Sequence, residues 1–516
     1  MLNQIEFING KINGFIWGVP ALVLLIGTGI LITCLTKFFQ VSHFGHWWKS
    51  TIGQMFKKKS GVLKNEEKHS ISQFQALCTA LAATVGTGNI AGVATAIATG
   101  GPGAVFWMWV AAFFGMMTNY AENVLGIFYR RKNEEGEWCG GAMYYLRDGL
   151  GKKRGCKHIG KILSILFCIF AIFASFGIGN LAQANTISTN LALTIEDIAR
   201  SINPDFVSPV LMLGNLEISL IMLIIGIVLF IIAALVIVGG LKRIASVTEK
   251  LVPFMVVMYV IGSLVIICVN IDKIGAVFAS IFQFAFGFKA IAGALVGEAV
   301  KNAITIGCKR GVFSNEAGLG SSVMVHSASN VKEPVVQGMW GIFEVFADTM
   351  IVCTMTAVTV LSSGLIDLST GALLTEAADT ALVAQAFSSV FGNFGSLFVS
   401  VAILCFAFST ILGWSYYGSK AWEYMLGTKS TIGYKVFFVL LIVVSASLPK
   451  AYISLPWDLS DTFNGLMMIP NLIGVLTLSG TVLAITKNYC KRKIKGEDVA
   501  PMLSAFPNIQ KEQEEA

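Results

Sequence analysis

The chain has 516 residues, of which 55% are hydrophobic and only 13% charged, with a formal net charge of +7. The charged fraction is about half that of an ordinary soluble domain, so the composition excludes a soluble globular protein and requires lipid. The five histidines are scattered, the ten cysteines form no CxxC pair, and no Walker, G-x-S-x-G or zinc motif occurs, so we expect neither a cofactor nor an enzyme.

Long apolar runs divide the chain into eleven candidate membrane spans. A helix needs about 20 apolar residues to cross the hydrocarbon core, and its backbone groups must pair within it. The strands of an outer-membrane barrel are shorter and alternate in character, which excludes that class. We therefore predict an all-α membrane protein with eleven transmembrane helices, at residues 19–37, 71–99, 103–130, 159–190, 215–240, 249–271, 280–308, 335–364, 391–425, 432–449 and 460–487.

Positive charges lie mainly in alternate loops and in the C-terminal tail. Only five of the 37 Lys and Arg residues fall elsewhere, namely Lys11, Arg200, Lys273, Lys289 and Lys450. Cytoplasmic loops are rich in Lys and Arg, so we place the N-terminus outside and the C-terminus in the cytoplasm. This topology accounts for the net charge, and we expect lipid rather than nucleic acid as a partner. No charged n-region precedes a short apolar run, so no cleaved signal peptide is expected.

The second span is interrupted at its centre. Residues Thr84 to Asn89 (TVGTGN) place two glycines, two threonines and an asparagine at membrane depth, where they weaken a helix and present polar groups. Unwound backbone leaves N–H groups free for a carboxylate and C=O groups free for a cation. Gly86 and Gly88 alone would also suit close helix packing, but the polar Thr87 and Asn89 favour a binding site.

The seventh span contains a second Gly-rich stretch, from Phe286 to Gly297. Breaks in spans 2 and 7 divide the remaining chain into two sets of five spans, which predicts an inverted five-plus-five repeat with one extra N-terminal helix. The expected domains are residues 1–70 (peripheral first helix and amphipathic cytoplasmic loop), 71–271 and 272–487 (the repeats) and 488–516 (cytoplasmic tail).

Further polar residues lie in or next to the later spans. In span 9, Ser409 and Thr410 supply adjacent hydroxyl oxygens for a hard cation, although such pairs often only bond to the preceding turn. Asn315 and Glu316 fall in a loop on the cytoplasmic side, which Gly318 and Gly320 allow to turn tightly. Charged side chains within spans are costly and need a partner or a role, and Glu122, Lys289, Glu298, Glu344 and Asp348 are such residues. The roles of Lys289 and Glu298 stay open between an ion pair, a vestibule and proton coupling.

Five stretches of the chain resemble the alanine/glycine:cation symporter family, also called sodium:alanine symporters. They occur in the expected order and are Ala80–Gly103, Gly100–Gly115, Phe176–Ile187, Arg310–Ser322 and Phe406–Gly418. The run Val85 to Asn89 (VGTGN) also resembles the unwound first core helix of the leucine-transporter fold. The resemblance therefore implies that fold.

The resemblance also implies roles for single residues. The N–H groups of Thr87 and Gly88 would hold the substrate carboxylate, and the carbonyl of Thr84 would face the ammonium. The carbonyls of Ala82 and Val85 and the hydroxyls of Ser409 and Thr410 would face sodium, with Asn89 at a second cation position. The remaining substrate-site residues would be Gly177, Gln183, Gly293, Leu295 and Trp414. Gln183 could instead cap a helix contact and Trp414 could be a packing residue, while Leu295 replaces a phenylalanine common in the family.

These residues predict sodium-coupled symport of alanine or glycine into the cell, by alternating access across the cell membrane. Small residues at both breaks indicate a small substrate pocket. A proton-coupled amino-acid symporter is the nearest alternative. An uncoupled channel would need a continuous polar pore, and a membrane enzyme would need a nucleophile with its base.

Overall fold

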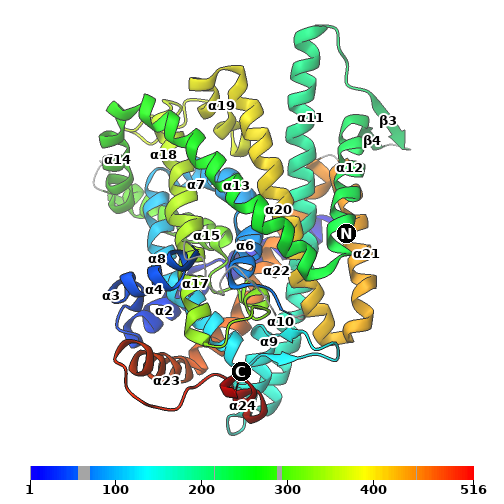
Figure 1. Ribbon diagram of the computed structural model, residues 1–516. Helices are drawn as coiled ribbons and strands as arrows, with labels where there is room; N and C mark the ends of the chain where they lie inside the picture. Colours follow the sequence, from blue (N-terminus) through cyan, green and yellow to red (C-terminus); the bar gives the residue numbers. More distant parts are fainter. Residues whose placement is uncertain (1, 56–69, 214–215, 288–292, 449, 516) are drawn as a thin grey trace.

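The computed structural model describes residues 2–55, 70–213, 216–287, 293–448 and 450–515. The described chain is a bundle of helices with two short antiparallel hairpins (Figure 1). The first hairpin pairs β1 (Arg131–Lys132) with β2 (Trp138–Cys139), and the second pairs β3 (Val210–Leu213) with β4 (Leu216–Ser219). The predicted helical fold class is confirmed.

The helices of the first half are α1 (Leu2–Ile16), α2 (Val19–Leu35), α3 (Phe39–Ser42), α4 (Phe44–Ser50), α5 (Ile52–Met55), α6 (Gln73–Thr84), η1 (Gly88–Gly92), α7 (Val93–Gly100), α8 (Gly103–Phe128), α9 (Ala142–Asp148), η2 (Leu150–Lys152), α10 (Lys157–Phe176), η3 (Gly177–Leu181), α11 (Ala182–Ile202), α12 (Leu220–Ile237) and α13 (Gly240–Val269). Those of the second half are η4 (Ile271–Lys273), α14 (Ile274–Phe286), α15 (Gly293–Asn315), α16 (Val323–His326), α17 (Pro334–Val345), η5 (Phe346–Cys353), α18 (Thr354–Ser362), α19 (Asp379–Phe391), α20 (Asn393–Leu426), η6 (Thr428–Ser430), α21 (Thr431–Ser447), α22 (Lys450–Thr477), α23 (Ser479–Tyr489), η7 (Cys490–Ile494) and α24 (Pro507–Glu515).

Eight helical segments of the described chain are long and apolar enough to cross a membrane, and two bent helix pairs raise the number to ten. The bent pairs are Gln73–Thr84 with Gly88–Gly100, at 54°, and Trp457–Thr477 with Ser479–Ile494, at 57°. Each of these ten has a counterpart among the predicted spans. The predicted span at 280–308 has none, because α14 and α15 divide that region. The count of eleven is therefore not confirmed.

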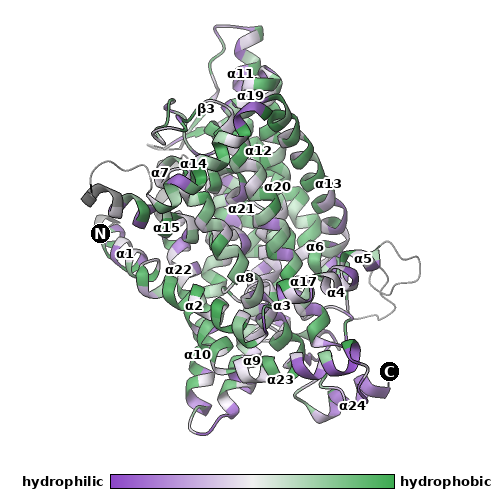
Figure 2. Ribbon diagram, turned by 90° about the vertical axis from the view of Figure 1, so that its left-hand side faces the viewer, coloured by the Kyte–Doolittle hydropathy of each residue, from purple (hydrophilic) through white to green (hydrophobic). Residues whose placement is uncertain are grey.

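Large apolar side chains are exposed along the outer helices. Examples are Ile231 and Leu235 on α12, Phe254 on α13 and Phe437 on α21, each at least half exposed. Figure 2 shows apolar residues over the middle of the bundle and polar residues concentrated toward its two ends. A soluble protein rarely exposes so much apolar surface, whereas lipid chains cover such a band. The protein is a multi-pass membrane protein.

The first predicted break is present between α6 and η1. Helix α6 begins at a capping box, in which Ser72 Oγ accepts from the Gln75 N–H (3.1 Å) and Gln75 Oε1 accepts from the Ser72 N–H (3.0 Å). The helix ends at Thr84, and the chain resumes at Gly88 as η1, a π-helical turn that continues into α7. The glycines and threonines that suggested an interruption therefore lie where the helix stops.

The second break lies elsewhere than predicted. Helix α14 ends at Phe286, and α15 runs without interruption from Gly293 to Asn315 over 23 residues. The Gly-rich stretch at 286–297 thus covers the end of α14 and the start of α15, and residues 288–292 within it, including Lys289, lie outside the described part. Small residues weaken a helix interior, but they also occur where one helix ends and another begins, and composition does not separate the two cases.

The interruption of the second half occurs at Glu316–Ser322, between α15 and α16. Glu316, Gly318 and Gly320 have positive φ angles of 56°, 94° and 74°. The segment is buried, and a Cβ on Gly320 would lie 2.6 Å from Asn471 Oδ1. Glycine is required there both for the left-handed backbone and for the close approach. The predicted tight turn at Gly318 and Gly320 is therefore a buried break within the bundle.

Candidate functional site

The two breaks lie side by side. A Cβ on Gly88, at the start of η1, would lie 3.4 Å from Cδ1 of Phe313 and 3.5 Å from Cα of Ser314. Ser314 is the penultimate residue of α15 and adjoins the second break. Two interrupted helices therefore meet in the bundle, as the sequence suggested, although the second partner is a different segment.

Gly293 and Leu295 do not lie at this meeting point, which corrects the prediction for both. Helix α15 is continuous, and at a rise of 1.5 Å per residue the backbone of Leu295 lies about 29 Å along the helix from Ser314. Gly293 is farther still. The side chains of both residues lie outside the described part of the structure, and we omit them from the site.

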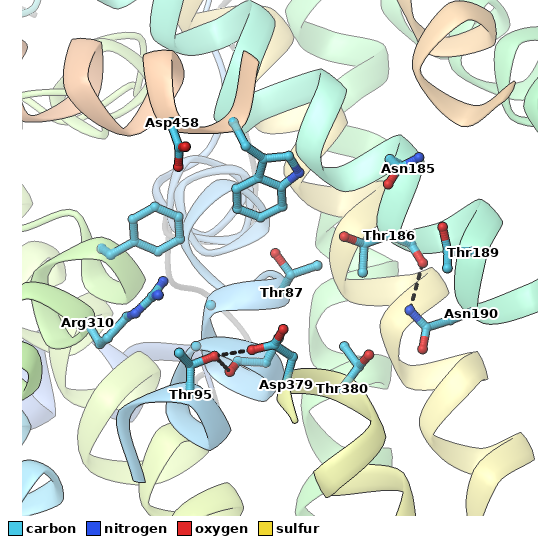
Figure 3. A pocket seen from close by; sticks show the side chains of 15 residues that line it. Thr87, Thr95, Asn185, Thr186, Thr189, Asn190, Arg310, Asp379, Thr380 and Asp458 are labelled. Atoms are coloured by element: carbon cyan, nitrogen blue, oxygen red, sulfur yellow. Dashed lines mark hydrogen bonds between the residues drawn. The ribbon is translucent and has the colours of Figure 1, made fainter. Parts of the chain in front are cut away.

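A cavity of about 310 Å³ opens beside the first break, at the lower end of the size range of ligand pockets. Thr87 and Gly88, the residues predicted to bind the substrate carboxylate, line it together with Phe313 from α15. Helix α11 adds a polar wall, in which Asn190 Nδ2 donates to the Thr186 carbonyl at 2.8 Å (Figure 3). The other residues of the cavity are Ala91, Gly92, Thr95, Asn185, Thr189, Arg310, Asp379, Thr380, Trp457 and Asp458.

Three charged side chains from three different helices line the cavity (Figure 3). Arg310 comes from α15, Asp379 from the start of α19 and Asp458 from α22. Thr95 Oγ1 donates to Asp379 Oδ1 at 2.5 Å. The cavity therefore presents both signs of charge, which complements the ammonium and carboxylate of an amino acid. Sequence reasoning missed these three residues, because each lies in a separate segment without a local motif.

Four other predicted substrate residues do not line this cavity. Thr84 Oγ1 donates back to the Ala80 carbonyl at 3.3 Å, and Gln183 Nε2 donates to the Ile178 carbonyl at 3.0 Å. A Cβ on Gly177 would lie 2.1 Å from Cβ of Ser460, so this glycine allows α10–η3 and α22 to approach closely.

Trp414, the fourth of these residues, supports the second break. Its Nε1 donates to Glu316 Oε1 at 2.9 Å, and its side chain is 1% exposed. A Cβ on Gly179 would lie 2.3 Å from Trp414 Cβ, so η3 packs directly on this residue. In this structure Trp414 thus fixes the break and η3 relative to α20 and does not wall the cavity.

The predicted sodium residues Ser409 and Thr410 lie on α20, which packs against the first break. A Cβ on Gly86 would lie 2.4 Å from Thr410 Oγ1, and one on Gly413 would lie 2.6 Å from Ala83 Cβ. Both hydroxyls donate to the Phe406 carbonyl, at 2.8 and 3.1 Å, and so retain lone pairs for a cation.

Backbone oxygens lie on the other side of this contact. Helix α6 ends at Thr84, so the carbonyls of its last turn, including that of Ala82, lack the usual partners within the helix. Val85 follows as the C-terminal cap. The Thr410 hydroxyl therefore lies against the segment that carries these carbonyl groups, and hydroxyl and carbonyl oxygens are the ligands that a hard cation requires.

Asp348 connects the two breaks. Asn89 Oδ1 accepts from the Gly86 N–H at 2.9 Å, and Asn89 Nδ2 donates to Asp348 Oδ1 at 2.7 Å. Ser314 Oγ donates to Asp348 Oδ2 at 2.8 Å. Asp348 lies in η5, a π-helical turn of the kind often found at functional sites. Its place within a predicted span was a signal that it needs a partner, but the sequence did not identify Asn89 and Ser314.

A multi-pass helical protein in which two interrupted helices meet beside a charged cavity has the architecture of a secondary transporter. The chain belongs to the sodium:alanine symporter family, whose model matches residues 2–502. This finding confirms the resemblance of the five sequence stretches.

Three relatives show the range of this family. The sodium/alanine symporter AgcS of Methanococcus maripaludis is 44% identical over 486 residues, which cover 93% of this chain and 96% of that protein. A putative sodium/proton-dependent alanine carrier protein of Bacillus subtilis, YrbD, is 34% identical, and the match covers 95% of this chain and 93% of that protein. The probable sodium/glutamine symporter GlnT of the same organism is 35% identical, and the match covers 96% of this chain and 93% of that protein.

Proposed function

We propose that this protein is a sodium-coupled symporter that carries small neutral amino acids, alanine or glycine, into the cell by alternating access. The observation that supports it most is the position of the first break. Its Gly86 end packs against the Thr410 hydroxyl, and its Gly88 end faces the charged cavity and the second break. One short unwound segment can therefore respond to both a cation and an amino acid.

The substrate carboxylate binds the N–H groups of Thr87 and Gly88, where η1 begins. The first N–H groups of a helix lack intrahelical partners, and the helix dipole favours an anion there. The Thr84 carbonyl does not line the cavity in this structure, and in the proposal it faces the ammonium of the bound substrate. Arg310, Asp379 and Asp458 attract the zwitterion into the cavity.

Sodium binds the carbonyls of Ala82 and Val85 and the hydroxyls of Ser409 and Thr410. Asn89 is a weaker candidate for a second cation, since its amide oxygen already accepts from the Gly86 N–H. The proposal also includes the leucine-transporter fold and the two repeats within 71–271 and 272–487. It places the N-terminus outside and the C-terminus in the cytoplasm. These features make alternating access a movement of one repeat against the other around the breaks.

We expect alanine uptake to require sodium and to persist when the proton gradient is collapsed. The reason is that the proposed coupling site consists of hydroxyl and carbonyl oxygens, which bind a hard cation. The measurement is uptake of labelled alanine into proteoliposomes of the purified protein, with sodium and proton gradients imposed separately. Uptake that follows the proton gradient and ignores sodium would replace the proposal with the proton-coupled alternative.

Glycine, alanine and serine are expected to compete for labelled alanine uptake, whereas leucine and phenylalanine are not. The limit arises at Gly88, where Phe313 and Ser314 already lie within 3.4 and 3.5 Å of a Cβ position. A large side chain bound with its carboxylate at Gly88 would meet the Phe313 ring. Equal competition by leucine would refute the small pocket. Competition by glutamine tests whether the substrate range of this chain differs from the one that the name of the relative GlnT indicates.

A further inference from the structure

A second cavity, of about 270 Å³, shares no lining residue with the cavity beside the first break. It lies between the junction of α12 and α13, the second half of α20, the start of α21 and the turn of the β1–β2 hairpin. Lys132 of this hairpin pairs with Glu512 of α24. The cavity therefore lies at the end of the bundle that carries the C-terminal helix, and the proposed sodium and substrate sites do not include it.

One wall of this second cavity is a network of paired charges. Lys420 Nζ lies 2.7 Å from Glu423 Oε2 and 3.4 Å from Glu137 Oε2, and the lysine side chain is 9% exposed. Asn133 Nδ2 donates to Glu423 Oε1 at 2.9 Å and connects the hairpin to α20. These groups pair with one another, so they hold the hairpin against α20 and form a fixed wall.

Two other charged side chains line the cavity without an ion pair among the described residues. Lys435 is half-buried on α21 and interacts electrostatically with Glu135 and Glu137 of the hairpin, but it forms no salt bridge with either. Glu135 is exposed in the hairpin turn. With Glu137, Glu423 and Lys420, the cavity holds three carboxylates and two ammonium groups. A ligand that carries both signs of charge complements this arrangement better than an anion does.

Two buried hydroxyl groups in the cavity also lack partners. Tyr416 is 5% exposed, and its Oη is buried without a hydrogen bond. Ser419, three residues further along α20, is 6% exposed, and its Oγ has no hydrogen bond in the described part of the chain. Buried hydroxyl groups normally have a partner, so both indicate that a polar ligand occupies the cavity.

The opposite wall is apolar and continues into the lipid-facing surface. Its residues are Ile237, Leu241, Ile244 and Ile432. Ile432 is 55% exposed, and the same surface includes Val436 on α21 (51%) and Leu235 on α12 (59%). Helices α12 and α21 pack against each other, and lipid chains cover the band of exposed apolar residues to which this surface belongs. A lipid whose chains lie on these two helices can place its headgroup in the cavity.

We propose that this cavity binds the headgroup of an aminophospholipid, whose phosphate pairs with Lys435 and whose ammonium pairs with Glu135. The two charges lie in the order that such a lipid presents them. Lys435 lies one turn inside the membrane-spanning helix α21, whereas Glu135 lies in the hairpin turn beyond the end of α8. The free hydroxyl groups of Tyr416 and Ser419 donate to phosphate oxygens. The bound headgroup therefore connects α20, α21 and the hairpin.

Other headgroups leave part of this cavity without a partner. Phosphatidylglycerol has the phosphate but no ammonium, so Glu135 would remain unpaired beside an added negative charge. The nitrogen of phosphatidylcholine is positive but carries no hydrogen that it could donate to a carboxylate. Phosphatidylethanolamine supplies both the phosphate and an N–H donor. The proposal therefore predicts an order of lipids, with phosphatidylethanolamine first.

Thermal unfolding of the purified full-length protein, depleted of lipid in detergent, tests this order with one lipid added at a time. A ligand that binds only the folded state raises the melting temperature. We expect phosphatidylethanolamine to raise it more than phosphatidylglycerol or phosphatidylcholine at equal concentration. O-Phosphoethanolamine, the same headgroup without chains, should give no comparable shift. An equal shift with either of the other lipids, or with O-phosphoethanolamine, would overturn the proposal.

Four substitutions locate the effect within the protein. Lys435→Gln and Glu135→Gln should each weaken the apparent affinity for phosphatidylethanolamine by about tenfold or more, since each removes a charge-assisted pair. Lys429→Gln and Glu134→Gln are the matched controls, because both residues are exposed nearby and do not line the cavity. They should keep the wild-type lipid titration.

Lys435→Arg keeps the positive charge and covers the case in which the glutamine variant does not fold. This variant should retain the preference for phosphatidylethanolamine. A wild-type titration in both Lys435→Gln and Glu135→Gln, or loss of the lipid effect in the two control variants, would contradict the assigned site. None of these results depends on whether sodium drives uptake, so this inference and the proposed function fail separately.

Discussion

Replacing Gly88 with valine is expected to abolish alanine binding at every sodium concentration. Valine adds two methyl groups beyond a Cβ that already lies 3.4 Å from the Phe313 ring and 3.5 Å from the Ser314 backbone. The backbone N–H groups of the first break then cannot approach a carboxylate. Equilibrium binding of labelled alanine to the purified variant, over a sodium titration, measures the effect.

Gly88→Ala is the matched control for this substitution. A single Cβ at 3.4 Å is an ordinary van der Waals contact, and Gly88 does not have a positive φ. The alanine variant is therefore expected to bind alanine, with a modest change in affinity. If the valine variant bound alanine as tightly as the alanine variant does, the substrate would not lie at Gly88.

The double substitution Ser409→Ala with Thr410→Val should weaken the apparent sodium affinity by about tenfold or more, equivalent to about 1.4 kcal/mol. It removes the Thr410 hydroxyl that lies against Gly86 and the neighbouring Ser409 hydroxyl, while nearly preserving side-chain volume. In the variant, a methyl group of the introduced valine replaces the Thr410 hydroxyl beside Gly86, so the packing is kept and the oxygen is lost. Alanine binding at saturating sodium should recover, because the cavity residues are unchanged.

Ser415→Ala on the same helix provides the control for lost hydroxyl groups. Ser415 Oγ donates to the Leu412 carbonyl at 2.7 Å, as Ser409 does to Phe406, but Ser415 lies more than a turn away from the Gly86 contact. Its replacement should leave the sodium titration unchanged. If the double variant behaved like this control, Ser409 and Thr410 would not be sodium ligands.

The first break could be predicted from sequence because its signal is local. Thr84 to Asn89 combine helix-weakening glycines with polar side chains in an apolar span, and the structure ends α6 at Thr84 and resumes at Gly88. Thr410 packs against this break at Gly86, and the prediction that Ser409 and Thr410 bind sodium stays a prediction.

The second break could not be predicted, because its signal depends on burial. Glu316 to Ser322 resemble an exposed turn in sequence, with two glycines and several polar residues, yet the segment is buried. The Gly-rich stretch near Gly293 has the composition of a break but lies between two helices. The cavity charges Arg310, Asp379 and Asp458 are brought together only by the tertiary fold.

The central claim is that one unwound segment couples sodium to a small amino acid, and a pair of binding titrations tests it most directly. Alanine affinity is measured against sodium at constant ionic strength, and sodium affinity is then measured against alanine. Linkage requires the two enhancements to be equal. We predict that sodium raises alanine affinity and that alanine raises sodium affinity by the same factor. Alanine binding that does not change when sodium is replaced by another monovalent cation would contradict the account.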